Sequence, residues 1–227
     1  MKKSVWLIDA DMTLFDFQKA EAVALRTACG RFGIEVGEAE KQLYHRINDA
    51  LWKQLERGEV TQARLRVQRF EQFVQALGLD VPPDALNRAY THDLGEGCYL
   101  FPQALSLLQG LHRKCTVCIL TNGITEVQTR RFQLSGLRPY VDALVISQQE
   151  GFSKPDPRIV ERALQRVGCA DKSQAVIVGD SLTSDMLAAK NAQVDGIWYN
   201  PAGLPDPGDN PYIRAQVRQL HDLFQFV

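Results

Sequence analysis

The chain has 227 residues, of which 45% are hydrophobic and 23% are charged, and its formal net charge at neutral pH is −1. This length suits one sizeable α/β domain with a smaller one. The charge argues against a surface for a nucleic acid polymer, and no apolar run approaches the roughly 18 residues of a membrane helix. There is no basic leader followed by an apolar segment. With five cysteines, an odd count, we expect a cytoplasmic protein with reduced thiols and no membrane partner.

The first predicted element is a buried strand over residues 5–8, which runs into the carboxylates Asp9 and Asp11. Side chains two positions apart point to the same side of an extended chain, so both should face one point. Two like charges held that close need a cation, a proton or a basic side chain between them. A single D-x-D is also typical of a solvated turn, so its interpretation depends on the other strands.

No convincing strand follows until residue 95. Helical stretches are predicted instead, at residues 19–32, 38–57, 61–77 and 83–91. In the second of them apolar residues recur at helical spacing, which indicates an amphipathic helix: Leu43, Ile47, Leu51 and Leu55. We therefore predict an all-helical domain at residues 18–94, inserted into an α/β domain formed by residues 1–17 and 95–227.

Three further strands are each followed by polar residues. After a helix over residues 103–112, the predicted strands are 117–120, 144–146 and 175–178. The polar groups that follow them are Thr121-Asn122-Gly123, then Lys154-Pro155 after a polar loop, then Gly179-Asp180 and Asp185. Because ligands of open α/β sheets bind beyond the carboxyl ends of the strands, we expect these groups to meet at one sheet edge.

Each group also has an ordinary explanation. Asn122 and Gly123 favour turns, and Asp180 is a suitable helix N-cap. Lys154 is harder to explain this way, because it opens the helix predicted over residues 158–166, where the helix dipole favours anions. A lysine at this position is explained if it reaches into a site that holds negative charge.

The C-terminal part is predicted as a strand over residues 196–199, a Pro-, Gly- and Asp-rich loop over 200–211, and a tail over 212–227. The tail should form a short strand and a closing helix that turns three apolar residues toward the core: Leu220, Leu223 and Phe224. A C-x-x-C sequence, Cys115 to Cys118, lies on a predicted strand. Residues three apart on a strand point to opposite faces, so we expect packing there and not a zinc or redox site.

Taken together, the four polar segments resemble the haloacid dehalogenase-like superfamily of phosphotransferases over essentially the whole chain. Its D-x-D-x-T motif is matched by Asp9, Asp11 and Thr13, and its Thr or Ser motif by Thr121. Its Lys motif is matched by Lys154, and its G-D-x(3,4)-D motif by Gly179-Asp180 and Asp185. The resemblance implies a Rossmann-like three-layer core with a parallel sheet, and identifies the helical insertion as a mobile cap.

The resemblance also implies a role for each motif residue. Asp9 would be the nucleophile that forms an aspartyl-phosphate, and Asp11 the general acid and base. Mg²⁺ would be held by Asp9, the backbone carbonyl of Asp11 and Asp180, and the sequence does not decide between Mg²⁺ and Mn²⁺. Thr121 and the backbone of Asn122 would bind phosphate oxygens, Lys154 would balance their charge, and Asp185 would orient Lys154 or a metal-bound water. Family members that attack carbon lack the second aspartate, so Asp11 points to phosphate.

The segments at residues 8–17, 51–70, 102, 121–123 and 136–147 are similar to the family of pyrimidine 5′-nucleotidases that act on noncanonical nucleotides. This implies a nucleoside 5′-monophosphate, most readily a pyrimidine one, as the small-molecule substrate. Aromatic residues suited to base stacking are Phe15, Phe17 and Trp52, with core or cap packing as the alternative for each. Arginines that could meet the substrate are Arg64, Arg66 and Arg69, with a solvated helix face as the alternative.

Two rival functions remain open at this point. A sugar-phosphate phosphatase or phosphomutase would share every motif residue and differ only in the cap. A phosphate-binding regulatory module is the alternative outside enzymes, but a silent relative would be expected to have lost Asp9 or Asp11, and both are present. The quaternary state is predicted only as a monomer or a weak homo-oligomer.

Overall fold

The computed structural model describes residues 2–205, 208 and 210–227. Within them one six-stranded sheet has the order β3-β2-β1-β4-β5-β6, and every neighbouring pair is parallel. The strands are β1 (Val5–Ile8), β2 (Thr116–Thr121), β3 (Ala143–Ile146), β4 (Ala175–Gly179), β5 (Asp195–Tyr199) and β6 (Ile213–Val217). Strand order reverses beside β1, which places the β1 and β4 ends at the position where such sheets bind ligands.

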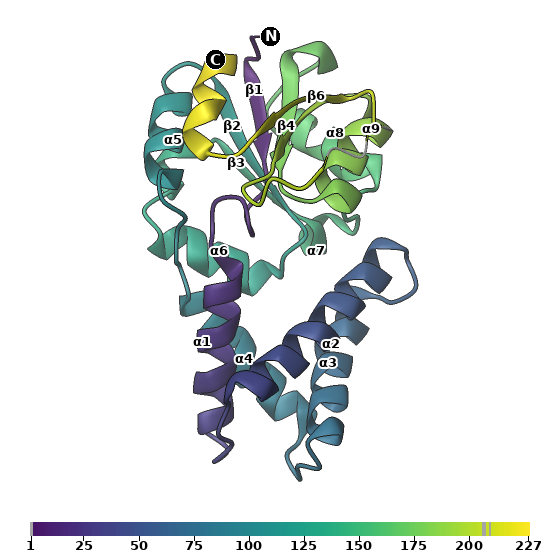
Figure 1. The fold of residues 1–227 in the computed structure, drawn as a ribbon. Coiled ribbons are helices and arrows are strands. Elements are labelled where there is room, and N and C mark those ends of the chain that lie inside the picture. The colour runs from purple at the N-terminus through teal and green to yellow at the C-terminus, as the bar shows by residue number, and fades with distance from the viewer. Residues whose placement is uncertain (1, 206–207, 209) are drawn as a thin grey trace.

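Helices cover both faces of the sheet (Figure 1). One face packs against α5 (Ala104–His112), α6 (Thr125–Leu134) and the C-terminal 3₁₀ helix η4 (Leu220–Phe226). The other packs against α8 (Pro157–Arg166) and α9 (Leu187–Ala192). Alternate residues of β1 divide between the two cores, with Trp6 and Ile8 in the first and Val5 and Leu7 in the second. This is the predicted three-layer α/β fold with a parallel sheet.

A helical segment projects beyond the carboxyl ends of the strands (Figure 1). It consists of α1 (Phe17–Gly30), α2 (Glu38–Glu56), α3 (Gln62–Ala76) and α4 (Pro83–Glu96). Asp16 caps α1 by accepting a hydrogen bond from the Lys19 backbone, and Pro83 occupies the first turn of α4. The helices share a core of their own, built around Leu25, Tyr44, Phe70, Phe73 and Tyr90. The segment is attached to the sheet domain through α6, whose Val127 packs into that core.

Several elements differ from the sequence-based predictions. The fourth helix of the segment continues to Glu96, five residues beyond its predicted end at 91. The polar loop expected after the β3 strand begins with a helical turn, α7 (Ser147–Glu150), which Gly151 ends with a left-handed φ of 75°. Helices α6 and α9 were not predicted. The tail forms the expected strand and helix, with the helix of the 3₁₀ type. The expected loop at 200–211 falls partly on residues 206–207 and 209, outside the described residues.

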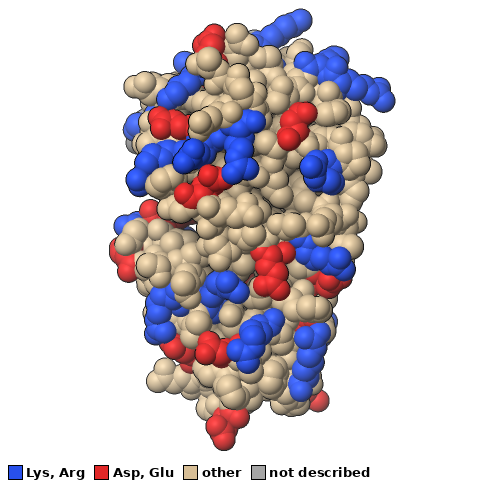
Figure 2. Space-filling view, turned by 180° about the vertical axis from the view of Figure 1, so that it is seen from behind, with Lys and Arg blue, Asp and Glu red and all other residues tan. Residues whose placement is uncertain are grey.

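The cysteine and charge patterns agree with the sequence-based view. Cys118 packs on one face of the sheet and Cys115 against the core of the other. All five cysteines are free thiols in the described part of the chain. Figure 2 shows basic and acidic side chains interspersed over one face of the molecule. Among the described residues, no helix has both the length and the apolar character needed to cross a membrane.

Candidate active site

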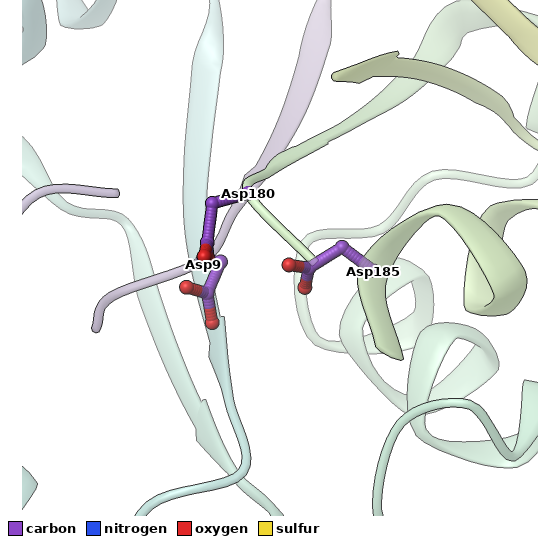
Figure 3. Close-up of side chains that lie close together, drawn as sticks. All are labelled: Asp9, Asp180 and Asp185. Carbon is purple, nitrogen blue, oxygen red and sulfur yellow. The ribbon is translucent and has the colours of Figure 1, made fainter. Parts of the chain in front are cut away.

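Three carboxylates meet at the carboxyl edge of the sheet. Asp9 follows β1, Asp180 follows β4, and Asp185 lies on the helical turn η3 (Leu182–Met186) that comes next. One carboxylate oxygen from each lies within 4.8 Å of the others, and Figure 3 shows the Asp185 carboxylate directed toward Asp9. The Asp9 backbone N–H donates to the carbonyl of Val178 (2.9 Å), so pairing between β1 and β4 continues past the end of β1 and aligns the two loops.

Lys154 supplies the positive charge in this cluster. Its Nζ donates to Asp9 Oδ1 (2.5 Å), Asp185 Oδ1 (2.6 Å) and the carbonyl of Leu120 (2.9 Å), and only 2% of its side chain is exposed. All three ammonium hydrogens therefore have an acceptor. The lysine at a helix start is thus explained by the anionic site it reaches, as the sequence pattern indicated.

Burial and mutual repulsion set the charges of the carboxylates. Burial raises the pKa of Asp9 well above its usual value; Lys154 opposes this shift, and Asp185 and Asp180 add to it. Burial, and then the Asp185 charge, raise the pKa of Asp180 to about 7. Burial alone would lower the pKa of Lys154, but the Asp185 and Asp9 carboxylates outweigh it and hold that pKa above its usual value. The site therefore has less positive charge than its carboxylates need.

The position of Asp185 depends on the glycine of the fourth motif. A Cβ atom added to Gly179 would lie 2.2 Å from the Asp185 carboxylate, so only glycine fits there. The second Asp185 oxygen accepts from the Ser181 backbone N–H (3.1 Å). One Asp185 oxygen thus contacts Lys154 and the other contacts the loop after β4.

Asp11 adopts a different arrangement from the one predicted. It lines the same pocket as Asp9, but its carboxylate lies outside the three-carboxylate cluster and accepts from Gln128 Nε2 (2.6 Å) and Arg131. The physical reason is that the extended backbone ends here, because the chain turns tightly directly after Asp11, at Met12, which has a left-handed φ of 64°. Each aspartate of the D-x-D pair thus has its own basic partner: Lys154 contacts Asp9, and Arg131 contacts Asp11.

The residues after β2 serve both the pocket and Lys154. The Thr121 hydroxyl accepts from the Gly123 backbone N–H (3.1 Å), and Thr121 lines the pocket. The Asn122 amide makes a reciprocal pair with the Lys154 backbone, donating to its carbonyl and accepting from its N–H, both at 2.8 Å. This support role for the Asn122 side chain was not predicted, because nothing in the sequence connects residues 122 and 154.

Helix α2 forms the opposite wall of the pocket. The lining residues from this helix recur every three to four positions along one face: His45, Asn48, Asp49, Trp52 and Glu56. The cavity has a volume of about 390 Å³, and hydrogen bonds join the helical segment to the sheet domain beside it. Thr183 Oγ1 donates to Glu56 (2.9 Å), and Gln62 Nε2 donates to the carbonyls of Asn122 (3.1 Å) and Gly123 (3.2 Å).

Of the aromatic candidates, Phe17 and Trp52 line the pocket. Phe15 does not, because it is fully buried against Phe132 in the sheet core. None of the three candidate arginines lines the pocket either. Arg64 pairs with Glu71 on the surface and Arg66 is half-buried. Arg69 is 1% exposed inside the helical segment, where it donates to Asn48 and Asn87.

The fold and this site define a class of protein, namely α/β proteins with a cluster of carboxylates at the carboxyl edge of a parallel sheet. A model of the haloacid dehalogenase-like hydrolases matches residues 5–193. The chain belongs to this family, as its motifs predicted, and is a hydrolase.

Individual proteins similar to the chain extend this result. It is 34% identical to pyrimidine 5′-nucleotidase YjjG of Escherichia coli (strain K12), over 98% of this chain and 97% of that one. It is 36% identical to pyrimidine 5′-nucleotidase PynA of Streptococcus pneumoniae, over 87% and 84%. The crystal structure of the HAD-hydrolase YfnB from Bacillus subtilis, bound to magnesium, superposes with a TM-score of 0.92 at 30% identity and covers 99% and 98%.

Proposed function

We propose that this hydrolase is a magnesium-dependent phosphatase that cleaves nucleoside 5′-monophosphates, pyrimidine nucleotides in particular, through an aspartyl-phosphate. The observation that carries the proposal is the contact of Lys154 with both Asp9 and Asp185, beneath a pocket that Asp11 and Thr121 also line. Phosphoryl transfer needs mainly positioning and charge stabilisation, which such a group of side chains supplies. The similarity to two pyrimidine 5′-nucleotidases supports the substrate class.

The proposed reaction assigns a role to each of these side chains. A carboxylate oxygen of Asp9 attacks phosphorus while the bond from phosphorus to the ester oxygen breaks, and Asp11 protonates that oxygen so that the nucleoside leaves as an alcohol. Asp11 then takes a proton from water, whose oxygen attacks phosphorus and breaks the bond to Asp9. Thr121 and the backbone of Asn122 hold the phosphate oxygens, and Lys154 balances their charge.

The carboxylate cluster suits a hard divalent cation. Asp9 and Asp180 offer oxygens within 4.8 Å of one another, and their raised pKa values reflect a shortage of positive charge. Asp9, Asp180 and the backbone carbonyl of Asp11 would hold Mg²⁺, or Mn²⁺ in its place. When bound, the ion would supply charge stabilisation to the phosphate oxygens. The magnesium in the YfnB structure supports this proposal.

Removal of the cation is expected to stop the reaction. Phosphate release should fall to background in excess chelator and return with added Mg²⁺. Asp180→Asn should weaken Mg²⁺ binding by at least about 10–100-fold, the loss that removing an outer-shell partner of a metal ligand typically causes, measured by calorimetric titration. Asp84→Asn, an exposed change in α4, is the control. Activity that is unchanged in chelator would contradict the metal assignment.

The charges that line the pocket also favour substrates with a single phosphate group. Lys154 is the one Lys or Arg among its described lining residues, whereas carboxylates come from both walls: Asp9, Asp11, Asp49, Glu56, Asp180 and Asp185. Lys154 and a divalent cation are the positive charges available to one phosphate, and a second anionic group would meet Asp49 or Glu56 without a Lys or Arg among the described lining residues. Monophosphate esters with an uncharged leaving group are therefore preferred over nucleoside diphosphates.

Trp52 is proposed to stack on the base. Trp52→Ala should lower kcat/KM for uridine 5′-monophosphate by roughly 5- to 100-fold, the usual effect of losing one base-stacking contact. Hydrolysis of ribose 5-phosphate, which carries no base, is the matched control and should change little. An equal loss on both substrates would show that Trp52 only packs within the helical segment.

The same panel tests the whole substrate proposal. Uridine monophosphate should be hydrolysed faster than uridine diphosphate and faster than glucose 6-phosphate. A preference for hexose phosphates would instead support the sugar-phosphate alternative, which the catalytic residues alone do not distinguish.

We further propose that residues 18–94 act as a cap that opens and closes over residues 1–17 and 95–227. A phosphoenzyme must be screened from water and then opened for product release. The hydrogen bonds of Glu56 and Gln62 to the sheet domain are polar, which suits a reversible closure. The interdomain movement of YfnB supports such a motion.

A further inference from the structure

Asp11 is held by two neighbouring side chains of α6. Arg131 Nη1 donates to Asp11 Oδ1, and Gln128 Nε2 donates to Oδ2 at 2.6 Å. The two donors are three residues apart and so lie on one face of the helix. Neither belongs to a motif that the sequence analysis singled out, and the proposed mechanism does not use them.

Arg131 is itself fixed from three directions. Its guanidinium is fully buried and lies over the Phe15 ring at 4.3 Å, and its Nε donates to the Gly97 carbonyl at 3.1 Å. Gly97 is the C-cap of α4, where the chain leaves the helical segment. An arginine held in this way forms a rigid support, because none of these contacts allows the guanidinium to turn independently.

The Asp11 side of the pair is open to the pocket. The Asp11 side chain is 26% exposed and lines the cavity, while the Arg131 side chain is 0% exposed. A carboxylate has about four acceptor positions, and Arg131 and Gln128 occupy two of them, one on each oxygen. The remaining positions stay available for a proton shared with the ester oxygen of a substrate.

We propose that Arg131, assisted by Gln128, is the positioning residue that sets the orientation of Asp11 for proton transfer to the leaving group. This inference rests on the proposed role of Asp11 as general acid. Burying an arginine is costly unless it is paired. Here its partner is the one carboxylate of the D-x-D pair that Lys154 does not contact. Without this support Asp11 would rotate among its side-chain rotamers and present its proton incorrectly in most of them.

The test compares two leaving groups by kcat/KM, which reports the steps up to release of the alcohol. The nucleoside of uridine 5′-monophosphate leaves as an alkoxide, which needs a proton. The leaving group of p-nitrophenyl phosphate is a stable phenolate, which does not. Arg131→Lys and Arg131→Met should lower kcat/KM for the nucleotide by roughly 10- to 100-fold. For p-nitrophenyl phosphate the same variants should stay within about threefold of the native enzyme, because general acid catalysis contributes little there. Gln128→Leu should show the same selectivity with a smaller loss.

Two reference variants make the outcomes distinct. Asp11→Asn should show the leaving-group selectivity most strongly, with a nucleotide loss of about 10²–10⁴-fold. Arg130→Met removes the neighbouring exposed ion pair with Glu96. It therefore perturbs α6 beside the same linker without touching Asp11, and hydrolysis of both substrates should be unaffected.

If Asp11→Asn shows no selectivity, the proposed role of Asp11 fails, and this inference fails with it. If Asp11→Asn is selective while Arg131→Lys and Gln128→Leu reduce both substrates equally, only the positioning role is overturned. Gln128→Leu keeps that comparison available should the Arg131 variants not fold.

Discussion

Asp9→Asn is expected to abolish turnover and to leave the protein folded. An amide oxygen is a far weaker nucleophile than a carboxylate, so the aspartyl-phosphate should not form and steady-state phosphate release should fall by on the order of 10⁴-fold or more. The fold should persist because asparagine has the same shape, and Lys154 keeps Asp185 and the Leu120 carbonyl as acceptors.

Thermal unfolding tests the second half of this expectation. Since burial and the neighbouring Asp185 and Asp180 raise the pKa of Asp9, removing its charge relieves repulsion, and the variant should be as stable as the native protein in the absence of metal. The exposed control Asp84→Asn should retain full activity. Measurable hydrolysis by a homogeneous Asp9→Asn preparation, free of native enzyme, would exclude Asp9 as the nucleophile.

Lys154→Met is expected to have the second large effect, on both activity and stability. Methionine keeps the length of the side chain but leaves Asp9 and Asp185 without their ammonium partner. Losing such a charge-stabilising donor should lower kcat by about 10²–10³-fold, and leaving a buried charge unpaired should lower the free energy of unfolding by about 3–5 kcal/mol.

The stability loss should depend on pH in a definite direction. A carboxylate whose folded pKa is raised loses stability as the pH rises through that value. Burial, then Asp185, place the Asp180 pKa at about 7, and removing Lys154 withdraws an influence that lowers it. The metal-free variant should therefore lose stability, relative to the native protein, between pH 6 and pH 8. Denaturant unfolding at both pH values measures this, with the exposed Lys190→Met as control. Near-native kinetics and stability for Lys154→Met would show that Lys154 is an ordinary helix-start residue.

Much of the fold was predictable because its signals are local. The core strands are short apolar runs bounded by turn residues. In β1, alternate residues enter two different cores. Because such a strand is buried on both faces, its sequence is a continuous apolar stretch. Helix α2 has its apolar positions at helical spacing, and its predicted range of 38–57 ends within one residue of the observed Glu56. The end of α4 was predicted too early, because α4 continues to Glu96 and packs against α1 and α6, contacts that its own sequence does not show.

The pocket walls were predictable only in part. Trp52 and Phe15 were both candidates for the pocket. Trp52 lines it, whereas Phe15 is buried in the sheet core. Both are aromatic residues beside apolar segments, and their sequence environments do not separate them. Phe15 is directed into the core because the turn at Met12 brings its backbone alongside Leu100, a contact between residues 85 positions apart in the chain. Arg69 was a plausible surface residue by its helical pattern, but α3 packs that face against α2 and α4, where Asn48 and Asn87 receive its hydrogen bonds.

The sequence by itself determined the family and the parallel α/β core, because strand ends and their following residues are encoded locally. It also indicated the helical insertion and singled out the candidate site residues Asp9, Asp11, Thr121, Lys154, Asp180 and Asp185. Only the tertiary structure decided how these groups are paired. Lys154 joins Asp9 to Asp185, Asn122 holds the Lys154 backbone, and Arg131 holds Asp11. Each contact joins residues at least 31 positions apart, and which partners meet depends on how parallel strands and the helices between them align. That alignment follows from packing of the whole chain, which no single segment of sequence contains.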